Sequence, residues 1–333
     1  MKQGYLSNIR IKGIEIYYPE DFDYVDDIIT KYKEQGIDIE LELKDSLGKN
    51  IVHHIKSKDE NTLTMAVKAA KKVLDSTGLT GKDLDQIALA TLSPEYILPA
   101  TARLIHTMVE GKEEAFCYDI NANCSGMLFS MNQIAAQMQS SDSLHYVMLI
   151  GSDSPSIHMR NDQYISKSIL GDSACAIILE KTDTDSSILD HKFLCNYTHP
   201  LSVACGPCCG LSHIHEAPIE DQKIILGKAP IQTEVISTHI QEVLARNNLT
   251  VDDISLFCFS QYSKSLLNKL AKKLEISMDK VIYNGDKYGY TGVTCTFIAL
   301  YDAIQEKKIK RGDYVFFWTF GSGVEMVFTL MRY

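Results

Sequence analysis

The two halves of this 333-residue chain repeat the same order of features at a nearly constant distance. Residues 82–105 read as an acidic turn, an apolar strand, a serine, a loop and a helix, and residues 251–274 read in the same way. The two serines, Ser93 and Ser260, hold corresponding places about 167 residues apart. Solenoid repeats have periods of roughly 20 to 50 residues, so a period of half the chain indicates a duplicated domain.

A second pair of segments repeats at nearly the same distance. Residues 116–138 place Cys124 at the corner between a strand-like run and a helix-like run. Residues 281–304 place Tyr290 at the matching corner of the second half, and a glycine follows two residues later in both copies. Because the matches keep their order along the chain, the repeat extends over most of each half.

Strands and helices alternate along both halves. A turn and a strong apolar strand follow each corner helix, at residues 144–154 and 312–323. Helical patterns such as TLTMAVKAAKKVLDSTG stand between the strands, which is typical of layered α/β domains. The sequence therefore predicts an α/β fold built from two duplicated halves, residues 1–181 and 182–333.

Charge and hydrophobicity argue against several classes of partner. The 33 basic and 43 acidic side chains give a net charge of −10, which disfavours non-specific binding to nucleic acid or to an anionic membrane. No apolar run approaches the roughly 18 residues of a membrane span, and the N-terminal residues lack the pattern of a secretion signal. The nine cysteines mostly sit in apolar runs, so we expect free thiols and a cytoplasmic protein.

Cys124 is the main candidate for a catalytic residue. Small polar residues surround it (NAN before, SG after), and it stands where a helix is predicted to begin. The positive end of a helix dipole favours the thiolate, so we expect the pKa of Cys124 to fall. A duplicated fold would also bring Cys124 and Tyr290 toward one pseudo-twofold axis. The alternative is a buried cysteine that only fills space, as free cysteines often do.

Four collinear segments carry a family resemblance that spans about residues 80–333. They are ATLSPEYILPATARLI, AFCYDINANCSGMLFSM, ILGDSACAIILE and GDYVFFWTFGSGVEMVFTLMRY. Together they resemble the β-ketoacyl-acyl-carrier-protein synthase III family of the thiolase superfamily. The resemblance implies a thiolase-like five-layer αβαβα sandwich of two duplicated halves, which is normally a homodimer. It also implies acyl-CoA or acyl-carrier-protein thioesters as substrates and no permanently bound cofactor.

The resemblance assigns roles to particular residues. Cys124 takes the acyl group from the thioester, and the backbone N–H groups of Cys124 and Ser322 hold the oxyanion. The family's catalytic His and Asn fall on Ser260 and Tyr290, so both places are changed. Ser and Tyr hydroxyls donate hydrogen bonds, but neither is cationic near neutral pH. We therefore expect Cys124, Ser260 and Tyr290 to form the site of an acyltransferase in which decarboxylative condensation is doubtful.

The N-terminal region also departs from the family. Family members carry a Trp and an Arg near the start that grip the adenine end of coenzyme A, close to a Thr-Gly-Ile-Arg run. This chain has LGKN at residues 47–50, and its single Trp is Trp318. The resemblance thus favours a carrier-protein thioester as the donor, with the acyl carrier protein as a partner.

One further segment, CGPCCGLSHIHEA at residues 205–217, has ligand types that zinc accepts. Its spacing matches no finger that we know, so we expect a plain loop and no metal. A zinc site or a replacement catalytic histidine remain alternatives for this segment.

The sequence thus leaves three functions open. The first is an acyltransferase of a specialised fatty-acid or polyketide-type pathway, in which Cys124 passes its acyl group to an acceptor that needs little help from His and Asn. The second is a degenerate, non-elongating partner subunit that pairs with a homologous synthase as a heterodimer. The third is a standard decarboxylative 3-oxoacyl-carrier-protein synthase III.

Overall fold

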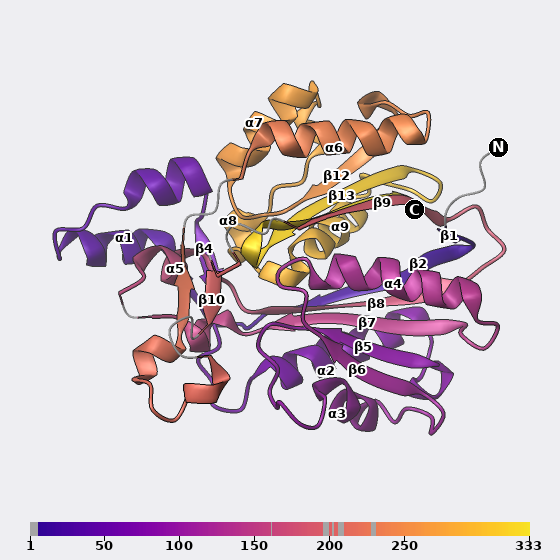
Figure 1. Ribbon diagram of the computed structural model, residues 1–333, viewed down its shortest axis with the longest axis horizontal. Coiled ribbons are helices and arrows are strands. Elements are labelled where there is room, and N and C mark those ends of the chain that lie inside the picture. The colour runs from indigo at the N-terminus through magenta and orange to yellow at the C-terminus, as the bar shows by residue number, and fades with distance from the viewer. Residues whose placement is uncertain (1–5, 161, 196–199, 202, 206–209, 228–230) are drawn as a thin grey trace.

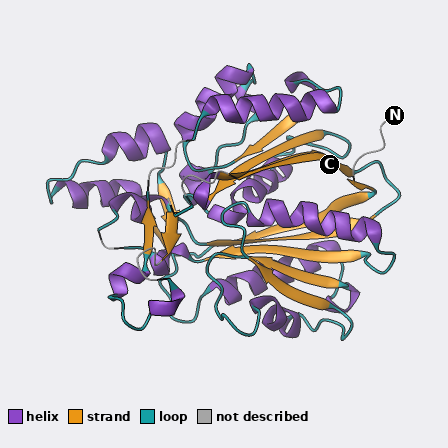
Figure 2. Cartoon of the chain, in the orientation of Figure 1, coloured by secondary structure: helices purple, strands orange, loops and turns teal. Residues whose placement is uncertain are grey.

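The computed structural model describes residues 6–160, 162–195, 200–201, 203–205, 210–227 and 231–333. Two five-stranded sheets lie face to face, with one layer of helices between them and a further layer outside each sheet (Figures 1 and 2). This arrangement confirms the predicted α/β fold with five layers.

The first sheet belongs to the N-terminal part of the chain. Its strand order is β2-β8-β7-β5-β6, with β5 parallel to both of its neighbours. β5 is buried along its whole length because helices cover both faces of the sheet. The strands are β2 (Ile9–Tyr17), β8 (Ser173–Lys181), β7 (Tyr146–Asp153), β5 (Gln86–Ala90) and β6 (Phe116–Ile120).

The second sheet has the corresponding order, β1-β9-β14-β13-β12. β12 runs parallel to β13, and β14 runs antiparallel to both β13 and β9. Only the short β1 comes from the other end of the chain. The strands are β1 (Leu6–Ser7), β9 (Ser187–Cys195), β14 (Glu325–Arg332), β13 (Tyr314–Gly321) and β12 (Ile254–Phe259).

The helices divide into one inner pair and two outer pairs. The inner helices, α4 (Gly126–Ser140) and α9 (Cys295–Gln305), contact strands of both sheets. α9 has the sequence CTFIALYDAIQ, and a helix that is apolar nearly all round is stable only when it is buried. The outer helices are α2 (Thr62–Thr77) and α3 (Thr101–Met108) on the first sheet and α6 (Thr233–Arg246) and α7 (Lys264–Leu274) on the second.

A small capping motif occurs at matching places before β5 and β12. The backbone N–H and hydroxyl of Thr80 both donate to Asp83 Oδ2, at 2.7 and 2.8 Å. Thr250 makes the same two bonds to Asp253 at the same two distances. This local agreement supports the proposal that the chain is divided into repeats near residue 181, although the boundary itself stays a prediction.

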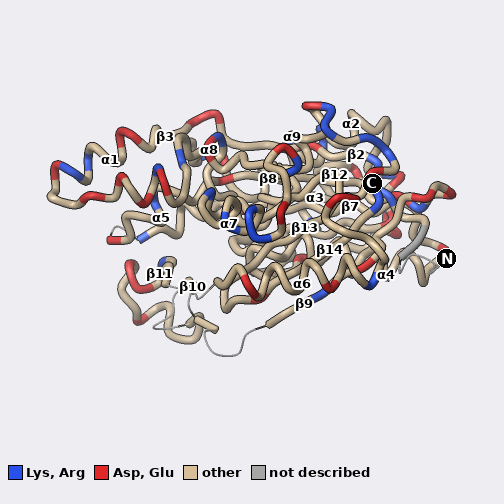
Figure 3. The backbone as a smooth tube through the Cα atoms, turned by 90° about the horizontal axis from the view of Figure 1, so that it is seen from above, with Lys and Arg blue, Asp and Glu red and all other residues tan. Residues whose placement is uncertain are grey.

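The remaining elements gather at one end of the sandwich, on the left of Figure 1. They include the LGKN run at residues 47–50 and a π-helix at Glu42–Leu47. Charged residues of both signs are spread over the outer helices and loops, including the elements at this end (Figure 3). These elements are β3 (Phe22–Tyr24), α1 (Val25–Lys33), β4 (Ile51–His53), α5 (Tyr164–Ile169), β10 (Val203–Cys205), β11 (Ile224–Leu226) and α8 (Gly285–Tyr288).

The longest helix of the described ranges is α2 (Thr62–Thr77), and the other helices there are shorter. None of these helices combines the length and the apolar character that crossing a bilayer requires.

Candidate functional site

Cys124 lies in the short loop between β6 and α4, where the two sheets approach each other. Asn123, just before it, has a left-handed backbone (φ 52°), which turns the chain sharply. The Asn123 side chain donates to Glu325 Oε1 at 2.7 Å, and this bond ties the loop to β14 of the other sheet. The thiol is therefore held at the junction of the two halves, in a residue that is half-buried as a whole.

The electrostatics of this thiol differ from the prediction. Helix α4 begins at Gly126, so Cys124 stands before its first turn. Burial raises the pKa of Cys124 to about 12, and the Asp153 carboxylate contributes to the rise. The prediction of a lowered pKa was wrong, because the loss of water around the sulfur and a nearby negative charge outweigh the helix dipole. The resting site holds a thiol.

Tyr290 lies beside Cys124, as the repeat predicts, and Ser260 lies beside Tyr290. The backbone of Tyr290 is fixed by Gly171 N–H, which donates to its carbonyl at 3.0 Å, and its side chain is 5% exposed. Ser260 follows β12, is fully buried, and donates its N–H to Trp318 O at 2.8 Å. Burial raises the pKa of Tyr290, and the side chains of Cys124 and Ser260 both act on it.

Several buried polar atoms at this site are unpaired. Within the described ranges they find no hydrogen-bond partner in the protein, although buried polar groups are almost always paired. The Tyr290 hydroxyl lies near enough to Cys124 to lower the pKa of the thiol, yet the two do not form a regular hydrogen bond. Donors and acceptors that have no hydrogen-bond partner, beside the thiols of Cys124 and Cys295, are suited to a polar substrate group. These atoms are Ser260 Oγ, Tyr290 Oη, Thr319 Oγ1 and Asp153 Oδ2.

The turn after β13 approaches the backbone of Cys124. A Cβ added at Gly321 would lie 3.3 Å from Cys124 N, so the lack of a side chain at Gly321 permits this approach. Ser322 comes next in the chain, and its hydroxyl donates to Val203 O. The two segments expected to supply the backbone oxyanion donors are therefore adjacent. The role of Cys124 and Ser322 as donors stays a prediction.

Two polar residues of this region were missed by sequence reasoning. Cys295, at the start of α9, is 1% exposed, and the side chains of Ser260 and Thr319 lower the pKa of its thiol while burial raises it. Lys49 is fully buried and donates from Nζ to Gln261 O at 2.6 Å and to Tyr283 Oη at 3.2 Å. The only signal for Lys49 was the altered LGKN run, which looks like an ordinary polar turn.

A cleft of about 770 Å³ opens at the same end of the molecule. Its floor includes Tyr32 and Met159, which belong to the same apolar cluster as Tyr290 and Cys295. Its rim carries more lysines than acidic residues. The charged lining residues are Lys31, Lys56, Lys167 and Lys223 together with Asp23 and Asp27.

The cysteine- and histidine-containing segment is only partly described. Cys208 and Cys209 lie outside the described residues. The Cys205 thiol donates to Gln222 O at 3.1 Å, and His213 faces Glu216 on the surface. Over the ranges that the structure describes, no three His, Cys, Asp or Glu side chains form a group that could hold a metal ion.

The buried Lys49 generates a prediction about stability and pH. Burial lowers the pKa of Lys49 to about 7, whereas an unfolded lysine titrates near about 10.4. Between pH 7 and 8.5 the unfolded chain binds more protons at this site than the folded chain. The free energy of unfolding should therefore rise with pH in this window, by at most about 1.4 kcal/mol per unit.

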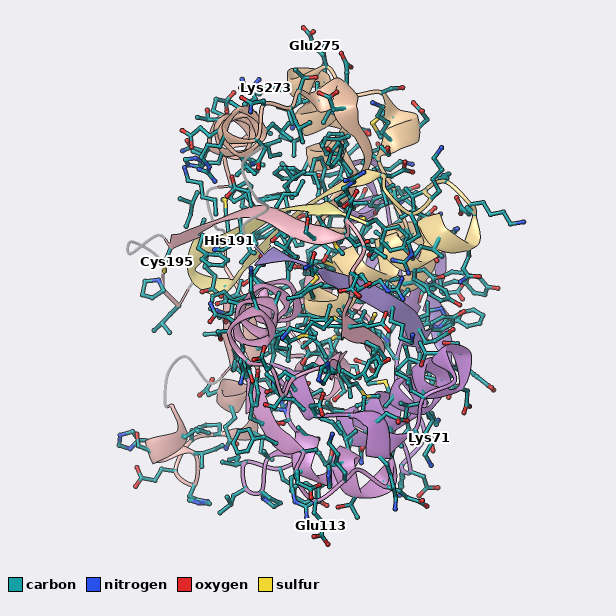
Figure 4. All side chains as sticks on the ribbon, turned by 90° about the vertical axis from the view of Figure 1, so that its right-hand side faces the viewer. Lys71, Glu113, His191, Cys195, Lys273 and Glu275 are labelled. Carbon is teal, nitrogen blue, oxygen red and sulfur yellow. The ribbon has the colours of Figure 1, made fainter. Side chains whose placement is uncertain are left out.

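Urea unfolding at several pH values in this window tests the prediction. Lys49→Met should lose the slope. Lys71→Met is the matched control, because Lys71 is exposed on α2 (Figure 4), and it should keep the slope. Equal slopes in wild type and Lys49→Met would contradict a lowered pKa at Lys49.

Comparison with known protein families covers both halves. A family model described as 3-oxoacyl-[acyl-carrier-protein] synthase III matches residues 118–196. The model of the C-terminal part of the same family matches residues 244–333. The first match contains Cys124, and the second contains Ser260, Tyr290 and Ser322.

Individual relatives agree with these matches. The chain is 30% identical over 279 residues to the β-ketoacyl-[acyl-carrier-protein] synthase III of Aquifex aeolicus. This match covers 83% of this chain and 86% of the relative. The chain is 31% identical to the β-ketoacyl-[acyl-carrier-protein] synthase III of Koribacter versatilis, over 84% of this chain and 86% of the relative. The crystal structure of the synthase III from Aquifex aeolicus superposes with a TM-score of 0.84, covering 98% and 100% of the two chains at 27% identity. With this sequence match and this thiolase-like fold, the chain belongs to the β-ketoacyl-acyl-carrier-protein synthase III family of the thiolase superfamily.

Proposed function

We propose that this family member is an acyltransferase in which Cys124 accepts an acyl group from a thioester and then passes it to a second substrate. The observation that carries the proposal is the set of buried polar atoms without hydrogen-bond partners beside the Cys124 and Cys295 thiols at the junction of the two halves. A thioester carbonyl is the kind of group that such a site would receive, because backbone N–H groups near Cys124 would stabilise the oxyanion.

The side chains at the site shape the second step. Ser260 and Tyr290 offer neutral hydroxyl groups in place of a protonatable imidazole and an amide. Removal of one oxyanion donor costs roughly 10²–10³ in rate, so decarboxylation of a malonyl group would be poorly supported here. We therefore infer an acceptor that brings its own nucleophile: an amine, an alcohol, a thiol or an already acidic carbon. A specialised biosynthetic pathway fits this chemistry.

A partner subunit is the second candidate. No histidine within the described ranges is among the groups that shift the pKa of Cys124 or Tyr290, which favours a degenerate site. Such a subunit would stabilise a homologous synthase in a heterodimer without elongating chains itself. The third candidate is the standard decarboxylative synthase, the activity for which the relatives are named.

Intact-protein mass spectrometry separates these candidates. We expect wild type to gain the mass of one acyl group when it is mixed with acyl thioesters on coenzyme A and on carrier protein. Cys124→Ala should show no gain, because the sulfur that forms the new thioester is gone. Cys195→Ala is the matched control, since Cys195 is an exposed thiol at the end of β9 (Figure 4).

The same experiment can contradict the acyltransferase. If no donor adds mass to wild type, the partner-subunit candidate takes its place. Co-purification with a homologous synthase would then be the next measurement. If Cys195→Ala loses the adduct and Cys124→Ala keeps it, the acylation is a surface reaction.

The lysine-rimmed cleft is the proposed docking place of the donor. Phosphopantetheine carries a phosphate in carrier proteins and in coenzyme A, and lysines attract such groups. The apolar cluster under the cleft extends to Tyr290 and Cys295, so the cleft and the candidate site lie against the same packed region. We propose an acyl carrier protein as the main donor and no permanently bound cofactor.

Charge reversal on the cleft rim tests this proposal. Lys31→Glu should raise the KM for phosphate-bearing donors by roughly threefold to tenfold, in line with an exposed charge contact. kcat should stay nearly unchanged. Lys71→Glu on the distant α2 should leave both constants unchanged. An equal effect of Lys31→Glu on an acyl-N-acetylcysteamine donor, which has no phosphate, would contradict the docking proposal.

The free edge of the first sheet is the proposed surface for a homodimer. β6 is an edge strand, and an unpaired edge is a template for a second chain. Phe116 on this strand is 69% exposed, and Ile97 and Leu98 in the preceding loop are 83% and 86% exposed. Two copies of β6 related by a twofold axis would pair antiparallel and cover these apolar side chains.

Sedimentation velocity tests the dimer. Phe116→Glu should shift the protein toward the monomer, because it places a charge in the apolar interface. Ile219→Glu is the matched control, since Ile219 is 74% exposed at another place, and it should leave the dimer intact. A wild type that sediments as a monomer would sink this proposal.

The free cysteines concern the cellular compartment of the protein. The seven cysteines in the described ranges form no disulfide with one another, which is typical of a reducing compartment. We keep the cytoplasm as the proposed location.

A further inference from the structure

Asp153 stands at the end of β7 and is 2% exposed. Its carboxylate is held by one oxygen only. Oδ1 accepts from Leu92 N at 2.6 Å, from Thr91 Oγ1 at 2.9 Å, and from Ser93 N and Oγ, both at 3.2 Å. These donors come from the segment that follows β5. They fix the rotation of the carboxyl group and hence the direction of its second oxygen.

The second oxygen, Oδ2, is an unpaired acceptor. It is shielded from solvent and has no hydrogen-bond partner within the described ranges. A buried carboxylate oxygen without a donor is unusual, since carboxylates can accept bonds at both oxygens. The folded protein thus holds open an acceptor that its own structure does not use.

Gly292 keeps a space open between this oxygen and the thiol. A Cβ built at Gly292 would lie 3.8 Å from Asp153 Oδ2 and 3.8 Å from Cys124 Sγ, and no other atom of the described residues, apart from the adjacent ones, is within 4 Å. The point is therefore in contact range of both groups. Gly292 comes from the second half and Asp153 from the first, so the space exists only because the halves pack together.

From this geometry we infer that Asp153 is the proton acceptor of Cys124, acting through Oδ2 across the space beside Gly292. The inference rests on the proposed acyl transfer at Cys124. It supplies the base that the site lacks once Ser260 and Tyr290 replace the imidazole and the amide.

The step balances without a further reactant. The Cys124 S–H proton passes to Asp153 Oδ2 as the sulfur forms its bond to the acyl carbon. The bond from the acyl carbon to the donor sulfur breaks, and the leaving thiolate takes the proton from Asp153. In the second half-reaction the acceptor's N–H, O–H or S–H proton follows the same route, and Cys124 returns to the thiol.

The titration behaviour of the carboxyl group suits this role. Burial raises the pKa of Asp153 to about 6, so the group is largely ionised near neutral pH and able to accept a proton. Its negative charge also helps to keep Cys124 protonated until a donor arrives.

A purely structural role is the competing explanation, because Oδ1 anchors the segment after β5. Asp153→Asn separates the two roles. The amide oxygen can accept the bonds that Oδ1 accepts, whereas the NH₂ group in place of Oδ2 cannot accept a proton. Thermal unfolding should show that this variant folds.

The test measures two reactions of Cys124 in the same variants. The first is acylation by acetyl-CoA and by acetyl-N-acetylcysteamine, followed by intact mass. The second is alkylation by iodoacetamide, which reports the thiolate fraction alone. Asp153→Asn should slow acylation roughly 100-fold, as removal of a general base does. Alkylation should not slow, because removing a negative charge favours the thiolate.

The outcomes are distinct. If wild type is acylated and Asp153→Asn is acylated at the same rate, the inference is wrong and the proposed function stands. If acylation and alkylation slow by the same factor, Asp153 only supports the site's structure, and the inference is again overturned. If neither donor acylates wild type, the proposed function fails and the inference fails with it.

Gly292→Ala provides a second variant. Its methyl group would fill the space between the sulfur and Oδ2 without touching the anchor of Oδ1. Because Gly292 has φ +55°, the variant should be less stable than wild type but still fold. Acylation should slow in this variant as well, and an unchanged rate would overturn the inference that Asp153 accepts the Cys124 proton across this space.

Discussion

The removal of the Cys124 thiol from water is the constraint on which the rest of the site depends. A buried thiolate is costly, so the fold stabilises the neutral thiol and raises its pKa. The neighbouring side chains shift the balance between thiol and thiolate in opposite directions. Tyr290 offers a hydroxyl dipole that lowers the pKa, and Asp153 brings a charge that raises it. Catalysis at such a site requires proton transfer together with attack, because a standing thiolate is scarce.

Much of the fold can be predicted because it follows from local patterns. The apolar strands and the corner helices are visible in the sequence, and the offset between halves places Cys124 and Tyr290 at equivalent strand ends. Side chains at equivalent strand ends meet when two like sheets pack face to face. The architecture and the meeting of Cys124 and Tyr290 were therefore accessible before the structure, whereas Ser260 was placed by the family resemblance.

The electrostatics were not accessible in the same way. The pKa of Cys124, the burial of Lys49 and the bare oxygen of Asp153 all depend on atoms that come from distant parts of the chain. Lys49 is held by Gln261 and Tyr283, more than two hundred residues away. Asp153 lies in a Gly-Ser-Asp-Ser run that reads as an ordinary turn after a strand. Only the packing of the halves gives these residues their environment.

The inner helices have a consequence for how such a protein changes over time. α4 and α9 each pack against both sheets, so the apolar core holds the halves together without help from the polar residues at their junction. Substitutions at that junction can then alter chemistry while the architecture persists. A gene duplication that first created two equivalent corners would leave one free to keep a nucleophile and the other free to diverge. The pairing of a cysteine at one corner with a tyrosine at the other fits such a history.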